Sequence, residues 1–240
     1  AATDSDTADS GGLTYSITTN DPSGTVFAVS GTALTMTAQD YETPACGSGG
    51  DSLTCVVVLA ATDAANTATA HTITVTITDT NDQAPAWTTA ATANVAEGAT
   101  AVATLAATDS DTADSGGLTY SITTDDPGTG TQFSVAGTAL TIAAQDYETP
   151  ACGSASNSLT CVVVLAATDA ANTATAHTIT VTITNTNDES PVWTSSDSVS
   201  VDEGTRNVVA LTTTDADSGD SATYSITSND NSLFEIDSGT

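Results

Sequence analysis

A repeat of 106 residues constrains the fold of this chain more than any other feature. The phrase SLTCVVVLAATDAANTATAHTITVTIT begins at Ser52 and again at Ser158, and AQDYETPACGS begins at Ala38 and again at Ala144, 106 residues apart in both cases. A third, more diverged copy contains TTDADSGDSATYSIT, which begins at Thr213. Such a period indicates several small domains of one kind, because each copy must build its own core.

Three domains follow from the repeat. We predict a first repeat at residues 1–82 without its N-terminal part, a complete repeat at 83–188, and a third repeat at 189–240 without its C-terminal part. The sequence is then a window on a longer array. Two alternatives stay open, namely an engineered fragment and a subunit whose open first domain is completed by a strand from a neighbouring chain.

The hydrophobic pattern within a repeat is that of β-strands. Residues 71–78 read HTITVTIT, so Ile73, Val75 and Ile77 can face a core while the threonines face water. Clusters of Gly, Asn and Asp separate such segments at short intervals, and no segment has a convincing helical period. Roughly seven strands per repeat predict an all-β fold, a linear array of tandem seven-stranded, Greek-key, immunoglobulin-like β-sandwiches.

Charge narrows the range of partners. The 240 residues carry 30 acidic side chains and one basic side chain, Arg206, for a formal net charge of −29. A chain with this charge does not bind nucleic acid or an anionic membrane electrostatically, and it attracts cations. No apolar run in the sequence is long enough to span a bilayer.

Four cysteines fall into two pairs with the same spacing. Eight residues separate Cys46 from Cys55, and eight separate Cys152 from Cys161. The even count and the repeated spacing predict two short-range disulfides, Cys46–Cys55 and Cys152–Cys161, and therefore an oxidising, extracellular setting. A zinc site is the alternative, although no histidine or further cysteine lies near either pair.

Acidic residues recur in register with the repeat. Asp109 and Asp111 flank one residue, and alternate side chains of an extended strand project to the same side, so both carboxylates can bind one ion. Carboxylate and carbonyl oxygens are the ligands of calcium, whereas transition metals prefer imidazole or thiolate. His71 and His177 lie within the alternating strands, away from the acids, and we interpret them as surface residues.

The motifs LxATDxD, LTYSI, QDYE, VxLAATD and DxNDxxPxW together resemble the cadherin repeat. The resemblance covers essentially the whole chain. It implies extracellular β-sandwiches in tandem, with calcium bound between successive domains. One domain would supply a glutamate of its first strand, the acids of a DxE segment and the linker, and the next domain a DxD pair and a later aspartate.

The resemblance implies a ligand set for each junction. For the first junction it comprises Asp40, Glu42, Asn81, Asp82, Asp109, Asp111 and Asp169, with backbone carbonyls of Thr80 and Gln83. For the second it comprises Glu97, Asp146, Glu148, Asn187, Asp188, Asp215 and Asp217. Asp4, Asp6 and Asp63 would serve a preceding junction. The linkers depart from the family pattern where Asn185 replaces Asp79 and where Gln83 or Glu189 replaces the usual final asparagine.

These features lead us to expect a calcium-rigidified extracellular stalk or filament with a structural or adhesive role. The near-identical neighbouring repeats and lysine-free, threonine-rich strands favour a microbial surface adhesin or fibre. The expected partners are calcium ions, neighbouring repeats or copies of the same chain, and another cell surface or a glycan. The alternatives are a fibre subunit joined by strand exchange between incomplete terminal domains, and a glycan- or ice-binding threonine surface. We do not expect an enzyme, because no Ser/His/Asp or Cys/His grouping is present.

Overall fold

The computed structural model describes residues 2–3, 5, 12–20, 26–46, 53–63, 66–67, 70–111, 117–125, 132–153, 159–174, 176–217, 219 and 221–237. Its contacts divide the chain into two compact units. Unit 1 consists of residues 1–86, 108–118 and 168–173, and unit 2 consists of residues 87–107, 119–167 and 174–240. Two short segments of the second sequence repeat therefore belong to unit 1.

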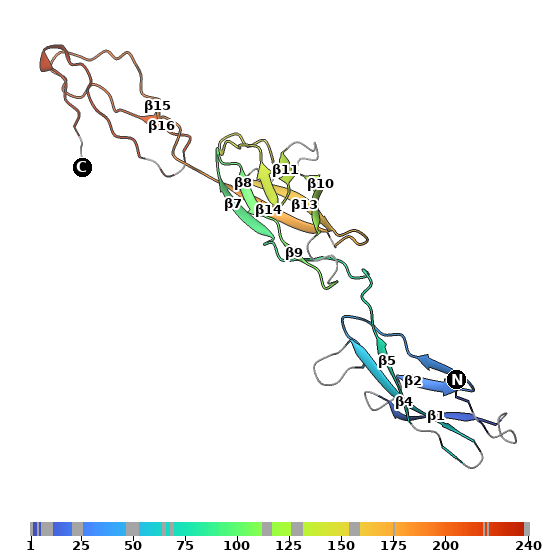
Figure 1. Ribbon diagram of the computed structural model, residues 1–240. Helices are drawn as coiled ribbons and strands as arrows, with labels where there is room; N and C mark the ends of the chain where they lie inside the picture. Colours follow the sequence, from blue (N-terminus) through green and yellow to red (C-terminus); the bar gives the residue numbers. More distant parts are fainter. Residues whose placement is uncertain are drawn as a thin grey trace. The chain divides into compact units, whose positions relative to one another are not determined.

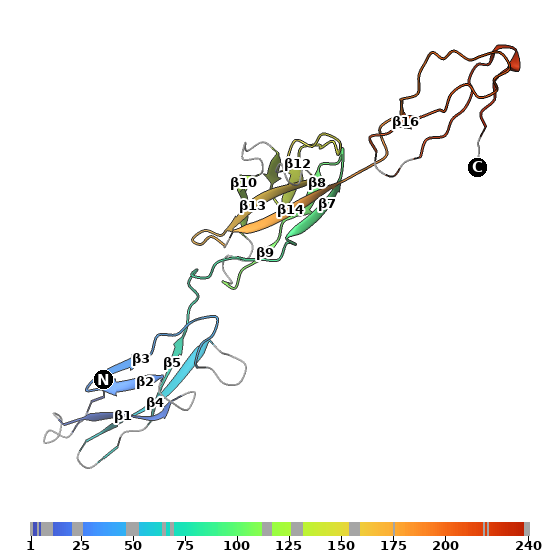
Figure 2. The same ribbon diagram turned by 180° about the vertical axis from the view of Figure 1, so that it is seen from behind.

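Unit 2 contains a β-sandwich of seven strands. The strands are β7 (Thr92–Ala96), β8 (Ala101–Thr104), β10 (Thr119–Asp125), β11 (Phe133–Ala136), β12 (Ala139–Ile142), β13 (Thr160–Thr168) and β14 (His177–Thr184). One sheet has the order β10-β13-β14-β7 and the other the order β11-β12-β8. The two sheets lie against each other in both views (Figure 1, Figure 2). The prediction of an all-β fold with seven-stranded sandwiches is confirmed.

The core of this sandwich follows from the alternation of its central strands. Val163 of β13 pairs with Ile179 of β14, and both side chains are fully buried. The two neighbours of Ile179, both threonines, point to the other face of the sheet. β14 also pairs in parallel with β7, with Ile183 opposite Val95. The first and last long strands of the repeat thus lie side by side, and both contribute to one core.

The predicted disulfides are confirmed. Cys46 bonds to Cys55 and Cys152 bonds to Cys161, with Cα–Cα distances of 5.2 and 5.3 Å. A buried glutamine shapes the loop before the second bond. The Gln145 side-chain amide donates to the Ala143 carbonyl at 2.7 Å, and its oxygen accepts the backbone N–H of Ala151 at 3.0 Å. This buried side chain is hydrogen-bonded at both ends, which offsets the cost of its burial.

The described residues of unit 1 include five strands that correspond to those of unit 2. They are β1 (Thr14–Asn20), β2 (Phe27–Ser30), β3 (Ala33–Met36), β4 (Thr54–Thr62) and β5 (His71–Thr76), arranged as sheets β1-β4-β5 and β2-β3. Their core comprises Val26, Phe27, Cys46, Cys55 and Val57. Among the described residues, no strand lies on the outer side of β5, which is therefore an edge strand.

The remaining elements are short. β6 (Ala86–Trp87) pairs with β9 (Ala107–Thr108), β15 (Val192–Trp193) pairs with β16 (Thr213–Thr214), and η1 (Asp230–Ser232) is a single 3-10 turn. Of the described residues from 194 to 237, only those of β16 are in a strand. This segment leaves several large apolar side chains exposed, among them Val201 and Phe234. No helix in the described part of the chain is long and apolar enough to cross a membrane.

Candidate metal centres

Four carboxylates of unit 2 converge on one place, which we name the second cluster: Glu97, Glu148, Asp188 and Asp217. Each offers an oxygen, and these oxygens all lie within 4.8 Å of one another. Glu97 follows β7, Glu148 lies in the loop between β12 and β13, Asp188 follows β14, and Asp217 follows β16. The ends of separate strands therefore bring together residues that are far apart in the sequence, and all four were predicted as ligands.

Backbone N–H groups hold two members of the second cluster in place. Glu97 accepts a hydrogen bond from Tyr147 N at 2.8 Å and another from Thr186 N. Asp217 Oδ2 accepts hydrogen bonds from the N–H groups of Asp188 and Glu189, at 3.1 and 2.8 Å. One carboxylate thus bridges the linker after β14 and the segment after β16.

Two oxygens of the second cluster are left without a protein donor. Asp217 is 4% exposed, and its Oδ1 atom is buried with no hydrogen-bond partner among the described residues. Glu148 Oε1 is in the same situation. A buried carboxylate oxygen that accepts no hydrogen bond is costly, and a cation bound by the pair would offset that cost.

The pKa shifts of two carboxylates in the second cluster are also those of a group that a cation would stabilise. Burial raises the pKa of Glu148, and the nearby charges of Glu97 and Asp217 raise it further. Burial also raises the pKa of Asp188, again reinforced by Glu97 and Asp217. Carboxylates this close disfavour one another's ionised form, and a divalent cation between them reverses that effect.

Two overlapping groups form the corresponding site in unit 1, which we name the first cluster. Glu42, Asp79 and Asp111 make one group, and Asp109, Asp111 and Asp169 make the other, each with oxygens within 4.8 Å. Asp111 belongs to both groups and is 0% exposed. Glu42 Oε1, Asp109 Oδ2 and Asp111 Oδ1 are buried without a hydrogen-bond partner among the described residues. Two of these, on Glu42 and Asp111, correspond to those on Glu148 and Asp217 in the second cluster, and the one on Asp109 has no counterpart there.

The two clusters share one local geometry. Asp111 Oδ2 accepts the backbone N–H of Gln83 at 2.9 Å, just as Asp217 Oδ2 accepts that of Glu189. The backbone N–H of Asp111 donates to Asp109 Oδ1 at 3.1 Å, and that of Asp217 donates to Asp215 Oδ1 at 3.0 Å. The second aspartate of each Asp-x-Asp pair thus points into its cluster, and the first holds it there by accepting its backbone N–H.

Hydrogen bonds made by Asn172 connect the first linker to Asp169. The backbone N–H of Asn172 donates to the Asp169 carboxylate, which lowers the pKa of that group. The Asn172 side-chain amide donates to Asn81 Oδ1. Asn81 therefore lies beside the first cluster, where its side-chain oxygen is one further oxygen that could bind a cation.

Other predicted ligands serve their own loops in this structure. The Asp146 carboxylate accepts the Thr149 hydroxyl at 2.7 Å, and the Asp40 carboxylate accepts the Thr43 hydroxyl at 2.9 Å. These hydrogen bonds lower the pKa of both aspartates. Both also accept the N–H of the glutamate two residues on. They thereby shape the turns that present Glu148 and Glu42.

Four further predicted residues that the structure describes belong to neither cluster: Asp63, Thr80, Asp82 and Asn187. Asp82 accepts the side-chain amide of Gln83 at 2.8 Å, and Asp63 accepts the backbone N–H of Asn66. Thr80 and Asn187 are exposed. Asp4 and Asp6 fall outside the described residues.

The ligand set expected from the sequence does not include Asp79, which the structure places in the first cluster. Asp79 opens the phrase DTND at the start of the first linker, but Asn185 stands at the matching position of the second linker. Asp79 shares a group with Glu42 and Asp111, whereas the linker acid of the second cluster is Asp188, three positions after Asn185.

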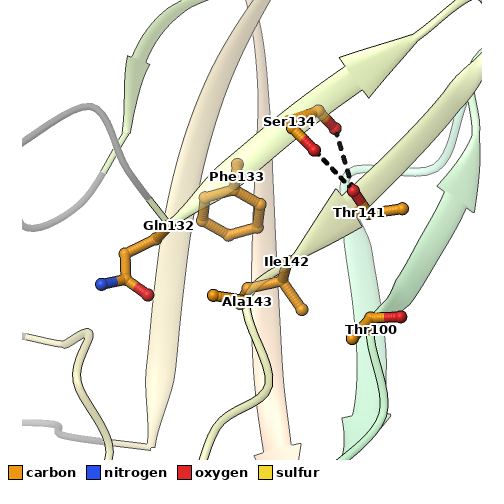
Figure 3. A pocket seen from close by; sticks show the side chains of 7 residues that line it. All are labelled: Thr100, Gln132, Phe133, Ser134, Thr141, Ile142 and Ala143. Atoms are coloured by element: carbon orange, nitrogen blue, oxygen red, sulfur yellow. Dashed lines mark hydrogen bonds between the residues drawn. The ribbon is translucent and has the colours of Figure 1, made fainter.

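A pocket of about 300 Å³ lies beside β11 and β12, and no residue of either cluster lines it (Figure 3). Its lining includes the Ser134 and Thr141 side chains on neighbouring strands. Their hydroxyl groups lie 2.7 Å apart and hydrogen-bond to each other.

Comparison with known proteins identifies the fold. The sequence matches no protein-family model and no curated protein. The crystal structure of human Protocadherin-24 EC1-2 is similar, with 22% identity, a TM-score of 0.53, and 72% of this chain and 82% of that chain covered. The Protocadherin Gamma B2 extracellular cadherin domains 3-6 give 21% identity and a TM-score of 0.63, with 86% and 51% covered. Human CDH23 EC21-23 gives 21% identity and a TM-score of 0.59, with 86% and 74% covered.

The class that the strands define is the all-β sandwich with two sheets packed face to face. Within that class the fold is cadherin-like, as the motifs of the sequence predicted. The chain spans about half of the Protocadherin Gamma B2 structure and most of the Protocadherin-24 structure.

Proposed function

We propose that this chain is part of an extracellular structural or adhesive array of cadherin-like repeats, made rigid by calcium bound at the first and second clusters. The observation that carries the proposal is a set of buried carboxylate oxygens that have no hydrogen-bond partner among the described residues. Five such atoms belong to Glu42, Asp109, Asp111, Glu148 and Asp217, and all of them lie in the two clusters.

The chemistry of the ligands favours calcium. Every candidate ligand is a carboxylate or amide oxygen, and calcium accepts six to eight such oxygens in flexible geometry. Magnesium needs a tighter octahedron and keeps several waters, so a converging group of four carboxylates suits it less well. Neither histidine nor cysteine belongs to these groups, which disfavours zinc and copper.

Binding would stiffen each linker through the second aspartate of the Asp-x-Asp pair. Asp217 already holds the N–H groups of Asp188 and Glu189 with one oxygen, and its other oxygen is available to a cation. A cation shared with Glu97 and Glu148 would therefore fix the linker to the sandwich at β7 and to the segment after β16. Without the cation, repulsion among the carboxylates favours a looser linker.

An extracellular location is part of the proposal and is supported by the two disulfides, which persist in oxidising compartments. The near identity of neighbouring repeats and the absence of lysine support a microbial surface fibre or adhesin. The partners would be calcium, other repeats of the array, and the surface to which the array adheres.

The test compares Asp217→Asn with Asp197→Asn, an exposed acid of the same segment outside the clusters. Calcium added to chelated wild-type protein should raise its melting temperature, because a site filled at about a hundredfold excess over its Kd adds roughly 2.7 kcal/mol. Asp217→Asn should lose most of this increase for unit 2, and Asp197→Asn should keep it. In chelator, Asp217→Asn should be no less stable than wild type, because the substitution relieves repulsion.

Calorimetry and isothermal titration with calcium measure these effects, and magnesium serves as the ion control. If calcium leaves the melting temperature of the wild-type protein unchanged, the proposal is wrong. Equal losses in the two variants would show that the charge of the segment matters and that the second cluster does not.

A further inference from the structure

The loop that carries Glu148 is held on both sides by residues that do not belong to the second cluster. It joins β12 to β13 and occupies residues 143–159. Gln145 lies near its start and is buried, and Cys152, also buried, bonds to Cys161 of β13. Glu148 stands between these two buried residues in the sequence, so both of its neighbouring stretches of chain are fixed.

The side chain of Gln145 links the two sides of this loop. Its amide donates to the side-chain oxygen of Gln132 at 3.0 Å and to the Ala143 carbonyl at 2.7 Å. Its oxygen accepts the backbone N–H of Ala151 at 3.0 Å. Ala151 directly precedes Cys152, so the glutamine connects the start of the loop to the residue before the disulfide.

The backbone of the same loop contacts the end of β7. The Gln145 carbonyl accepts the N–H of Gly98 at 2.9 Å, and the N–H of Tyr147 donates to the Glu97 carboxylate at 2.8 Å. Glu97 and Glu148 both belong to the second cluster. A displacement of this loop would therefore change the distance between two candidate ligands.

The same arrangement lies beside the first cluster. The side-chain oxygen of Gln39 accepts the backbone N–H of Ala45 at 2.9 Å, and Ala45 precedes the Cys46–Cys55 bond. Glu42, a member of the first cluster, stands between the glutamine and the disulfide in the sequence. A glutamine and a disulfide thus flank a candidate ligand in both units, which makes the arrangement a property of the repeat.

We propose that Gln145 and the Cys152–Cys161 bond, which we name the clamp, position Glu148 for the cation. The calcium affinity of the second cluster then depends on a glutamine and a disulfide that lie outside it. The corresponding residues of unit 1 act in the same way on the first cluster. This inference rests on the calcium proposal and adds what sets the affinity of its sites.

The clamp acts on affinity through the freedom of the loop. With the disulfide, the segment that carries Glu148 spans residues 143–151 between β12 and a fixed cysteine. Without it, the segment runs on to residue 159 and is roughly twice as long, which makes closure about threefold less favourable. Loss of residues that orient metal ligands lowers affinity by about tenfold or more in other sites. We therefore expect clamp variants to bind calcium about threefold to tenfold more weakly.

The first experiment titrates the second cluster alone. Asp111→Asn removes the residue that both groups of the first cluster share, and the full chain with this substitution is the reference. Gln145→Met keeps the length of the side chain but loses the amide donor and the carbonyl acceptor. Isothermal titration with calcium, well below the melting temperature, should show a Kd about threefold to tenfold higher for Gln145→Met. Cys152→Ala combined with Cys161→Ala should give an increase of the same size.

A matched control separates positioning from stability. Ile179→Val shortens a fully buried side chain of β14, so it destabilises unit 2 by a route that does not involve the loop. It should leave the Kd of the reference chain unchanged. The clamp variants should also be non-additive, because the glutamine and the disulfide act through one loop. Combining them should raise the Kd by less than the product of the separate increases.

The second experiment examines the loop in chelator, without any ion. Amide hydrogen exchange of Gly98 and Tyr147 reports the two hydrogen bonds that connect the loop to the end of β7. In Gln145→Met these two amides should exchange faster, while the amides of β13 and β14 keep their wild-type rates. Equal acceleration throughout unit 2 would mean that the glutamine contributes only to general stability, and the clamp would be wrong.

The outcomes distinguish the two proposals. If the reference chain binds calcium and both clamp variants bind it with an unchanged Kd, the clamp is overturned and the calcium proposal stands. An increase of the Kd in Ile179→Val as large as in Gln145→Met also overturns the clamp. If neither the wild-type protein nor the reference chain binds calcium, both proposals fail. Should the cysteine variant not fold, Gln145→Met decides the matter, because its disulfide is intact.

Discussion

The second repeat and residues 189–240 contain the same pattern of apolar residues but differ in whether they bury them. Val95 is 4% exposed in β7, and its counterpart Val201 is 49% exposed. Phe133 is 6% exposed in β11, and Phe234, which follows the same YSIT motif in the third copy, is 55% exposed. The local sequences are similar, so the difference lies in what surrounds them (Figure 2).

Most of the second repeat's core comes from residues after β11. Leu140 and Ile142 of β12, the disulfide, and the inward faces of β13 and β14 surround Val95 and Phe133. The described residues of the third segment have no counterpart of these strands. A strand with the right alternation therefore stays uncovered until partners distant in sequence pack on it, because a sandwich core is built from non-local contacts.

The largest effect is expected from truncating one isoleucine in the second repeat and comparing it with one in the third segment. Ile179→Ala deletes a fully buried side chain of β14, and we expect it to lower the free energy of unfolding by about 2–5 kcal/mol. Ile226→Ala removes a side chain that is exposed in the third segment, and we expect a change within about 0.5 kcal/mol. Denaturant unfolding measures both. Similar losses would mean that the third segment has a core of its own.

Removing a disulfide should have the next largest effect. Replacing Cys152 and Cys161 by alanine together frees the loop that leads to β13, and we expect a loss of about 2–3 kcal/mol from the unfolding of unit 2. The matched control replaces Cys46 and Cys55 in unit 1 and should leave the unit 2 transition in place. Calorimetry of the full chain separates the two outcomes. Loss of the unit 2 transition in the control would contradict the independence of the two cores.

The smallest effect concerns pH in the absence of calcium. Glu148 and Asp188 have pKa values raised above the ordinary 4.5 and 3.8, mainly by burial. Ionising them therefore costs more in the folded than in the unfolded protein. Their stabilising contribution is complete below the ordinary pKa values and is lost as the pH rises through the raised ones. Chelated unit 2 should thus become more stable as the pH falls from neutral towards 4.5.

Asp188→Asn is the variant that tests this pH dependence. It removes one of the two raised groups, so the gain in melting temperature on acidification should shrink. Asp146, whose pKa is lowered by the Thr149 hydroxyl, contributes with the opposite sign, and Thr149→Val should enlarge the gain. With calcium present the trend should reverse, because protons compete with the cation for the same oxygens. A gain that Asp188→Asn leaves intact would assign the pH dependence to other groups.

The sequence predicted the fold where its signal is local or repeated. Alternation in residues 71–78 predicted a strand, the cysteine spacing predicted both disulfides, and the motifs predicted the cadherin-like sandwich. The repeated Asp-x-Asp pairs predicted Asp111 and Asp217, which the structure places within the clusters. The assignment of calcium to them stays a prediction.

What the sequence did not predict depends on packing between distant segments. Residues 71–78 and 177–184 are identical, so no periodicity could distinguish the half-buried Ile77 from the buried Ile183. The difference is the presence of β7 beside one copy. The expected ligand set did not include Asp79, which lies in the first cluster, and no pattern in the sequence predicted that Gln145 is buried and hydrogen-bonded.

The parallel pairing of β7 with β14 has a mechanical consequence. These are the first and last long strands of the second repeat, and five residue pairs join them. A tensile force applied through the two ends of the repeat pulls the two strands in opposite directions along their length. The hydrogen bonds between them then share the load in shear, whereas a hairpin pulled from its open end would lose them one at a time. We therefore expect the repeat to resist stretching more strongly than its modest core suggests, with β7 and β14 as the element that yields first.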